Sequence, residues 1–350
     1  MIDIKGKQLE ARMEQIIRKI DDNDVQKLYS YTEKIDEKNP LEIFEGAERF
    51  RKNRFYWTDT ERKLTIIGVG NVRTLTAEKD RYRDIEKLWS RLLAEAWIEN
   101  PYSDVPATGV VAFGGMDFDP LKPKTELWRK FKLSQFYVPE LMLTVYDSNC
   151  YLTSNVLLGK DDHAEQIANE LQMKQAKFLS GKPLDHEKII INKRMEIATD
   201  QWLDTVRHAT EEMKQKKAEK IVLARELRLH FRDEVTIGPV LEKLCETQSS
   251  SYIFAYESEG DCFIGATPER LVKLQKKELL STCLAGTAPR GRTKEEDERI
   301  GKELLQDKKN RDEHEFVVQM IKEASHRAQE HGALHPGLRA DEPPLGPDPR

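Results

Sequence analysis

The chain has 350 residues, enough for two domains or for one large domain built from two stacked halves. Its 57 basic and 62 acidic residues give a net charge of −5, and basic runs have acidic neighbours, which argues against a nucleic-acid partner. The sequence has no run of 18 apolar residues and no signal-peptide core, so we expect a cytoplasmic protein without a membrane partner. The four cysteines lack metal-site spacing, and Cys262 and Cys283 lie in apolar runs typical of reduced, buried thiols.

The first half reads as one helical stretch, then strands, one amphipathic helix and further strands. The predicted segments, in that order, are helical 6–36, strands within 45–75, a helix over 79–98, and strands within 108–118 and 136–158. The helix over 79–98 carries an apolar stripe at intervals of three and four residues. Strands separated by glycine turns indicate an antiparallel sheet rather than a βαβ repeat.

A second unit begins near residue 185. Its predicted segments are a helix over 194–220, a strand over 220–231, a helix over 236–246, antiparallel strands up to residue 283, and helices over 294–307 and 309–324. From Ser325 onward the composition changes: the sequence has no Lys, Ile, Val or aromatic residue and holds five of the 15 prolines. Such a segment buries too little apolar surface to offset its ordering entropy. We therefore expect three parts, residues 1–184, 185–324, and an unrelated, disordered tail over 325–350.

Lys220 and Glu269 are candidates for acid–base chemistry. Lys220 begins the predicted strand 220–231, where a solvated lysine at a strand end is the ordinary interpretation. Glu269 follows Pro268 directly after a strand, and turns of this kind commonly expose charge. A carboxylate held by a rigid proline turn is nevertheless well placed for acid chemistry if it faces a cleft.

Glu313 lies on the apolar stripe of the last predicted helix. Val317, Met320 and Ala324 follow it by four, seven and eleven positions, so Glu313 shares their face. A carboxylate that points inward needs a partner, because an isolated buried charge is very costly. An arginine, the amides of a helix N-terminus or a hard cation such as Mg²⁺ could serve, and the pattern leaves these alternatives open.

Four short segments in register resemble the chorismate-utilising enzymes and, within them, the isochorismate synthases. They are KIVLAR (220–225), GATPERL (265–271), CLAGTAPRG (283–291) and DEHEFVV (312–318). Any one of them is a weak signal, but four in order with consistent spacing are specific, and they cover about residues 195–324. The resemblance implies an α+β fold of two stacked antiparallel sheets flanked by helices.

The resemblance also implies an activity, a reversible and Mg²⁺-dependent exchange of hydroxyl groups on chorismate that feeds menaquinone or siderophore biosynthesis. Lys220 matches the general base, which takes a proton from the water that attacks ring carbon 2. Glu269 matches the general acid, which protonates the departing 4-hydroxyl group.

Further site residues follow from the same resemblance. Glu313 matches one of two glutamates that hold Mg²⁺ against the ring carboxylate of the substrate. Gly286 matches the loop that approaches the substrate closely, where a side chain would obstruct contact, and Ala285 and Thr287 are carried over as pocket wall.

Within the family, a lysine at position 220 indicates the hydroxyl-transferring branch. Aminating members lack this base and take ammonia from a glutaminase subunit, so we expect no such subunit here. A salicylate synthase, which adds elimination of pyruvate after the same first step, stays open.

The resemblance stops near Ala324, although the family core continues well past the matching point. The second Mg²⁺ glutamate and the later substrate-binding residues have no counterpart in residues 325–350. The sequence therefore leaves an alternative to an active isomerase: a C-terminally truncated, inactive fragment or a non-catalytic interaction protein of the same family.

Overall fold

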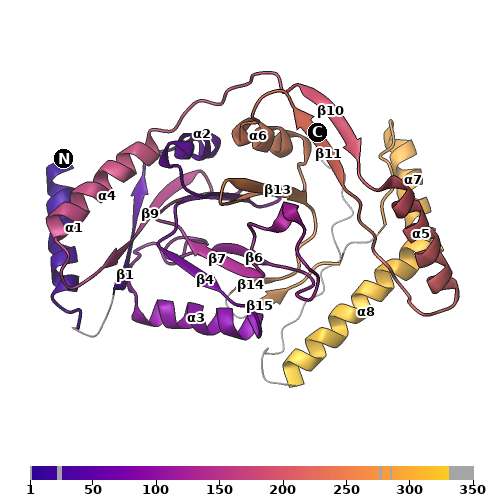
Figure 1. Cartoon of the computed structure of the whole chain (residues 1–350), viewed down its shortest axis with the longest axis horizontal. Helices are drawn as coiled ribbons and strands as arrows, with labels where there is room; N and C mark the ends of the chain where they lie inside the picture. The colour runs from indigo at the N-terminus through magenta and orange to yellow at the C-terminus, as the bar shows by residue number, and fades with distance from the viewer. Residues whose placement is uncertain (1, 22–25, 276–277, 284–285, 331–350) are drawn as a thin grey trace.

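The computed structural model of the chain describes residues 2–21, 26–275, 278–283 and 286–330 (Figure 1). The strands in these ranges form an eight-stranded sheet, a three-stranded sheet and two two-stranded ribbons. None of the described helices has the length and apolar content needed to span a bilayer.

The eight-stranded sheet draws its strands from both halves of the sequence. In spatial order they are β13 (Asp261–Thr267), β12 (Tyr252–Ser258), β2 (Arg54–Thr58), β3 (Leu64–Val69), β8 (Leu141–Tyr146), β9 (Asn149–Leu158), β1 (Lys27–Ile35) and β5 (Trp97–Glu99). Neighbours are antiparallel except at one edge, where β5 runs parallel to β1. The pairing of β12 with β2 attaches the second half of the chain to the first.

A smaller antiparallel sheet packs on one face of the large sheet. Its strands are β4 (Arg73–Thr76), β7 (Ser134–Val138) and β6 (Phe113–Met116). The ring of Phe55 from the large sheet lies 5.1 Å from that of Phe113 and 5.6 Å from that of Tyr137, centroid to centroid. These aromatic contacts join the two layers, and the predicted α+β class with stacked antiparallel sheets is confirmed.

Helices cover the opposite face of the large sheet and complete the main core. They are α1 (Ile2–Ile17), α2 (Pro40–Gly46), α4 (Ala164–Leu179) and α6 (Ile237–Thr247). Met13, Phe44, Phe178 and Leu241 extend from these four helices into one hydrophobic cluster with the sheet and are at most 2% exposed. The cluster places most of the buried apolar surface in the first half of the chain.

The remaining helices and ribbons lie outside this core. They are the 3₁₀ turns η1 (Ala47–Phe50) and η2 (Glu126–Trp128), the helices α3 (Arg81–Glu95), α5 (Thr199–Lys214), α7 (Lys294–Gln306) and α8 (Lys308–Glu330), and the ribbons β10 (Ile191–Glu196) with β11 (Leu227–Phe231) and β14 (Lys273–Gln275) with β15 (Glu278–Leu280). Figure 1 shows α5, α7 and α8 together, at the opposite side of the molecule from α1 and α4.

Apolar side chains on these outer elements are largely exposed. Neither α5 nor α7 has a buried residue, and all five residues of β11 are exposed. The exposed apolar side chains of residues 185–330 include Ile191, Leu203, Leu227, Leu229, Phe231, Leu271, Leu274, Phe316 and Met320. An exposed apolar surface of this extent is uncommon on a soluble monomer.

Four sequence predictions of secondary structure were wrong in part. The helix expected over 309–324 continues to Glu330, so residues 325–330 of the expected disordered tail are helical, and residues 331–350 of that tail lie outside the described residues. Residues 27–35, expected to be helical, form β1, because Lys27–Ile35 pairs along its whole length with β9. The helix expected over 194–220 begins only at Thr199, because residues before it form β10. The strand expected over 220–231 begins only at Leu227, because its partner β10 ends at Glu196, opposite Leu227.

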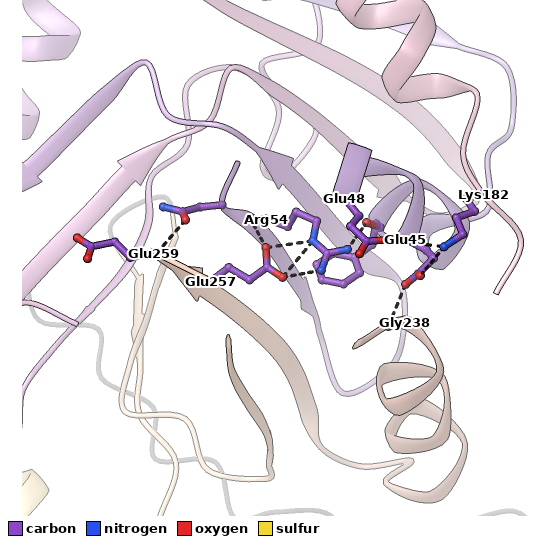
Figure 2. Close-up of polar contacts among 9 residues, drawn as sticks. Glu45, Glu48, Arg54, Lys182, Gly238, Glu257 and Glu259 are labelled. Atoms are coloured by element: carbon purple, nitrogen blue, oxygen red, sulfur yellow. Dashed lines mark hydrogen bonds and ion pairs between the residues drawn. The ribbon is translucent and has the colours of Figure 1, made fainter. Parts of the chain in front are cut away.

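A buried ion pair fastens β12 to β2. Figure 2 shows the guanidinium of Arg54 beside the carboxylate of Glu257, with Nη2 to Oε1 at 2.6 Å and Nε 3.0 Å from both oxygens. The side chains are only 9% and 13% exposed. Burial acts to lower the pKa of Arg54, but the hydrogen bonds and charge of Glu257 outweigh burial and raise that pKa. The guanidinium also lies 4.6 Å from the ring centroid of Phe44.

A second buried carboxylate ties α2 to the start of α6. Glu45 is 1% exposed and accepts a hydrogen bond of 3.2 Å from the backbone N–H of Gly238, in the first turn of α6 (Figure 2). Its other oxygen lies 3.4 Å from the ammonium of Lys182. A negative charge at a helix N-terminus is stabilising, so Glu45 fixes α6 against the core.

The thiol of Cys262, on β13, has a pKa raised to about 12, chiefly by burial and then by the charge of Glu257. We expect iodoacetamide at pH 9 to label Cys262 at least about 100-fold more slowly in the folded chain than in the urea-unfolded chain, where the thiol titrates near 8.5. The stability contributed by the neutral thiol is complete below pH 8.5 and is lost as pH rises toward 12. Equal labelling rates in the two states, measured by peptide mass spectrometry, would contradict this expectation.

Candidate active site

Two of the predicted site residues form an ion pair. Lys220 follows α5 in a segment without regular structure, and its Nζ lies 3.0 Å from Oε1 of Glu313, in the second turn of α8. The side chains are 32% and 38% exposed, so Glu313 is half-buried rather than in a core. The sequence pattern predicted that this carboxylate needs a partner, which could be an arginine, the amides of a helix N-terminus or a cation. In the structure the partner is a lysine.

The thiol of Cys283 contacts the helix that carries Glu313. Its Sγ donates a hydrogen bond of 3.7 Å to the backbone oxygen of His314, the residue after Glu313. Burial raises the pKa of the Cys283 thiol; the charge of Lys220 lowers it and the charge of Glu269 raises it. Since both charges act on one thiol, Lys220 and Glu269 lie within electrostatic range of the same point.

Glu269 stands at the end of β13 in the predicted proline turn. Its backbone N–H donates a hydrogen bond of 3.1 Å to Oγ1 of Thr267, the last residue of the strand. The next residue, Arg270, donates 2.8 Å to the hydroxyl of Tyr252 at the start of β12. These two contacts hold the turn against the sheet, while the Glu269 side chain is exposed to solvent.

The predicted pocket loop meets α8 at Gly286. This residue has φ = +82°, and a Cβ built on it would lie 2.9 Å from Oδ1 and 3.0 Å from Cβ of Asn310. Thr287 is exposed, and Ala285 lies outside the described residues. The loop therefore contacts the same helix that carries Glu313, one turn before it.

Replacing Gly286 with alanine is expected to lower the free energy of unfolding by about 1–3 kcal/mol, because the side chain meets both a positive φ and Asn310. Gly260→Ala is the matched control: Gly260 has φ = +87° but no atom within 4 Å of a Cβ. Urea unfolding of both variants separates backbone strain from the clash. Equal losses of stability would show that Asn310 does not restrict this position.

The structure thus pairs Lys220 with Glu313 and places the thiol of Cys283 against the backbone beside Glu313, where the charges of Lys220 and Glu269 both act on it. Sequence reasoning missed Asn310, although it precedes Glu313 by three positions and so shares its helix face. It also treated Cys283 only as a packed thiol. None of the predicted residues lines the cavity of about 380 Å³ whose walls come from the two sheets, including Phe113, Phe254 and Tyr256.

Known proteins are similar to this chain across most of its length. Residues 14–337 match the family described as "Chorismate binding enzyme". Isochorismate synthase MenF of Bacillus subtilis is 39% identical over 303 residues, which cover 85% of this chain and 64% of that protein. The salicylate biosynthesis isochorismate synthase of Pseudomonas aeruginosa is 28% identical over 298 residues, covering 83% of this chain and 60% of that protein. The chain therefore spans less than two thirds of the length of these curated relatives.

The architecture has a counterpart among solved structures. MenF of Escherichia coli, described as the menaquinone-specific isochorismate synthase, superimposes with a TM-score of 0.66 at 18% identity, covering 92% of this chain and 68% of that one. At that identity the likeness concerns the fold. Because the sequence match extends from residue 14 to residue 337, the chain belongs to the chorismate-binding enzyme family.

Proposed function

We propose that this chain carries the catalytic residues of an isochorismate synthase, which converts chorismate to isochorismate in the cytoplasm without a glutaminase subunit. The observation that carries the proposal is the ion pair of Lys220 with Glu313, which joins two distant segments of the chain beside Cys283, a thiol on which the charge of Glu269 also acts. Support comes from the 39% identical relative named isochorismate synthase MenF.

The proposed chemistry is a proton transfer at each of two positions of the substrate ring. Water adds at ring carbon 2 while the hydroxyl group leaves carbon 4. Lys220 accepts a proton from the attacking water, and Glu269 donates a proton to the leaving oxygen, which departs as water. One water molecule enters and one leaves, so protons and oxygen atoms balance.

Gly286 and Thr287 would form the wall beside the substrate. The absence of a side chain at Gly286 leaves the backbone accessible, and Asn310 limits this loop from the side of α8. Ala285 is carried in the same role from the family resemblance.

Magnesium, which the family resemblance implies, does not fit the described residues by themselves. Mg²⁺ requires near-octahedral oxygen ligation. The described part of the chain contains no group of three or more His, Cys, Asp or Glu side chains that could hold a metal ion, and the carboxylate of Glu313 is paired with Lys220. The proposed proton transfers therefore use only the side chains of this chain.

The test is incubation of the purified chain with chorismate, with and without Mg²⁺, and chromatography of the products. Isochorismate as the product, in amounts lost in Lys220→Ala, supports the proposal. Salicylate with an equal amount of pyruvate would instead assign the salicylate synthase activity. Absence of any turnover above the Lys220→Ala variant would contradict both.

A non-catalytic interaction protein is the second candidate, and the exposed apolar side chains of residues 185–330 favour it. A surface of this kind is typical of one that another polypeptide covers. Light scattering after size exclusion and binding of a hydrophobic dye would test this candidate. A monomer that binds no dye would contradict it.

A further inference from the structure

Arg270, the residue after Glu269, turns its side chain back toward the sheet. Its Nη1 donates a hydrogen bond of 2.8 Å to the hydroxyl of Tyr252, at the start of β12. Its Nε is buried and has no hydrogen-bond partner among the described residues. A buried donor without a partner costs free energy, so the bond to Tyr252 helps to hold this side chain inward.

The hydrogen bonds of Glu269 and Arg270 end on two residues that face each other. Tyr252 on β12 lies opposite Thr267 on β13, at the open end of the hairpin. The backbone N–H of Glu269 donates 3.1 Å to Oγ1 of Thr267. The turn is therefore attached to both strands of the hairpin, with one hydrogen bond to each.

The ring of Tyr252 is held in place by the large sheet. It stacks on Trp57 of β2, with ring centroids 5.6 Å apart and an angle of 28° between the ring planes. Glu269, by contrast, is exposed to solvent. The two neighbouring side chains of the turn thus lie on opposite sides of it, and the anchored Arg270 determines the direction in which Glu269 extends.

We infer that Arg270 is a positioning residue for Glu269 and that it acts through the hydroxyl group of Tyr252. An acid must lie within hydrogen-bond reach of the oxygen that it protonates, and a displacement of about 1 Å can lower a rate about 100-fold. This inference rests on the proposed function only for the choice of Glu269 as the acid.

The variant Tyr252→Phe tests the inference because it removes the hydroxyl group, keeps the ring on Trp57 and leaves the charge of the protein unchanged. We expect kcat for isochorismate formation to fall about 10- to 100-fold while KM stays within about twofold. Arg270→Met should give the same loss, and the double variant should lose no more than either single variant. Arg270→Lys, which can still donate to the hydroxyl group, should recover part of the rate.

The rate at which iodoacetamide labels Cys283 gives a second measurement, without chorismate. The charge of Glu269 raises the pKa of the Cys283 thiol, so Glu269→Gln should increase labelling near neutral pH about two- to threefold. Tyr252→Phe should increase labelling about twofold, and adding it to Glu269→Gln should have no further effect. The matched control on the same strand is Tyr256→Phe, whose hydroxyl donates 3.5 Å to the backbone of Gln135, and it should label at the parent rate.

Two results would overturn the inference: equal labelling of Cys283 in Tyr252→Phe and Tyr256→Phe, or effects of Tyr252→Phe and Glu269→Gln that multiply in the double variant. Circular dichroism melting checks that each protein is folded, and Arg270→Met replaces Tyr252→Phe if that variant does not fold. A chain that forms no isochorismate but shows the expected labelling would contradict the proposed function and leave the positioning role supported.

Discussion

Replacing Glu257 with glutamine is expected to lower the free energy of unfolding by about 3–5 kcal/mol, because it leaves the guanidinium of Arg54 buried and without its counter-charge. The Arg54 side chain is 9% exposed, and three of its nitrogen-to-oxygen contacts with Glu257 lie between 2.6 and 3.0 Å. Since the pair joins β12 to β2, the loss falls on the attachment of the second half of the chain to the large sheet. Urea unfolding followed by circular dichroism measures it.

The exposed pair Arg129–Glu126 is the matched control. Its partners are 3.2 Å apart, but their side chains are 68% and 79% exposed. Glu126→Gln is expected to change stability by less than about 1 kcal/mol. The double variant Arg54→Met with Glu257→Met, which removes both buried charges, should recover part of the loss. If Glu257→Gln costs no more than Glu126→Gln, the buried pair does not hold the sheet together.

Lys220→Met and Glu269→Gln are each expected to reduce kcat for isochorismate formation by about 10²–10⁴-fold, because each removes a proton transfer from the proposed reaction. Neither side chain belongs to the hydrophobic core, so thermal melting should stay close to that of the parent chain. The measurement is the initial rate of isochorismate formation from saturating chorismate.

Lys217→Met provides the control for these rates. Lys217 lies three residues before Lys220, is 57% exposed and pairs with Glu212 at 3.0 Å, away from Glu313. Its rate should equal that of the parent chain. Variants of Lys220 and Glu269 that also retain the parent rate would remove these residues from the proposed mechanism.

Local sequence patterns were sufficient to predict the helices and strands whose apolar residues are regularly spaced. The stripe of the helix over 79–98 predicted α3, and the charged repeats predicted α7 and the start of α8 nearly to the residue, although α8 continues to Glu330, beyond the predicted end at residue 324. The hairpin of β12 and β13 followed from alternation around the turn at Gly260. Hydrophobic periodicity is the strongest signal that a single sequence carries.

Pairing between strands that are distant in the sequence could not be predicted from local sequence patterns. Strand β1 is rich in charged and polar residues, and it is a strand because nine of its residues face β9. Strand β5 has three residues and depends on a parallel contact with β1. Such elements are determined by the partner that they meet, so their own sequences resemble helix or loop.

Site residues were predictable where the neighbouring sequence determines how the side chain is held. Helical spacing predicted that Glu313 requires a partner, although the stripe it shares is exposed at Met320 and Ala324 rather than directed into a core. The proline turn identified Glu269 as a well-held carboxylate. That Lys220 is the partner of Glu313 follows only from the folded path of the chain, since the two belong to separate segments. The roles assigned to Lys220, Glu269, Ala285, Gly286, Thr287 and Glu313 stay predictions from family resemblance.

The pairing of β2 with β12 affects how the chain folds during synthesis. Arg54 and Glu257 are 203 residues apart. At a translation rate of about 5–20 residues per second, β12 is therefore synthesised about 10–40 seconds after β2. Throughout that interval a nascent chain presents an unpaired strand edge with Phe55 and Tyr56 on it. We expect yield in the cell to depend on chaperones that act on ribosome-bound chains, and to rise when translation beyond β2 is made faster.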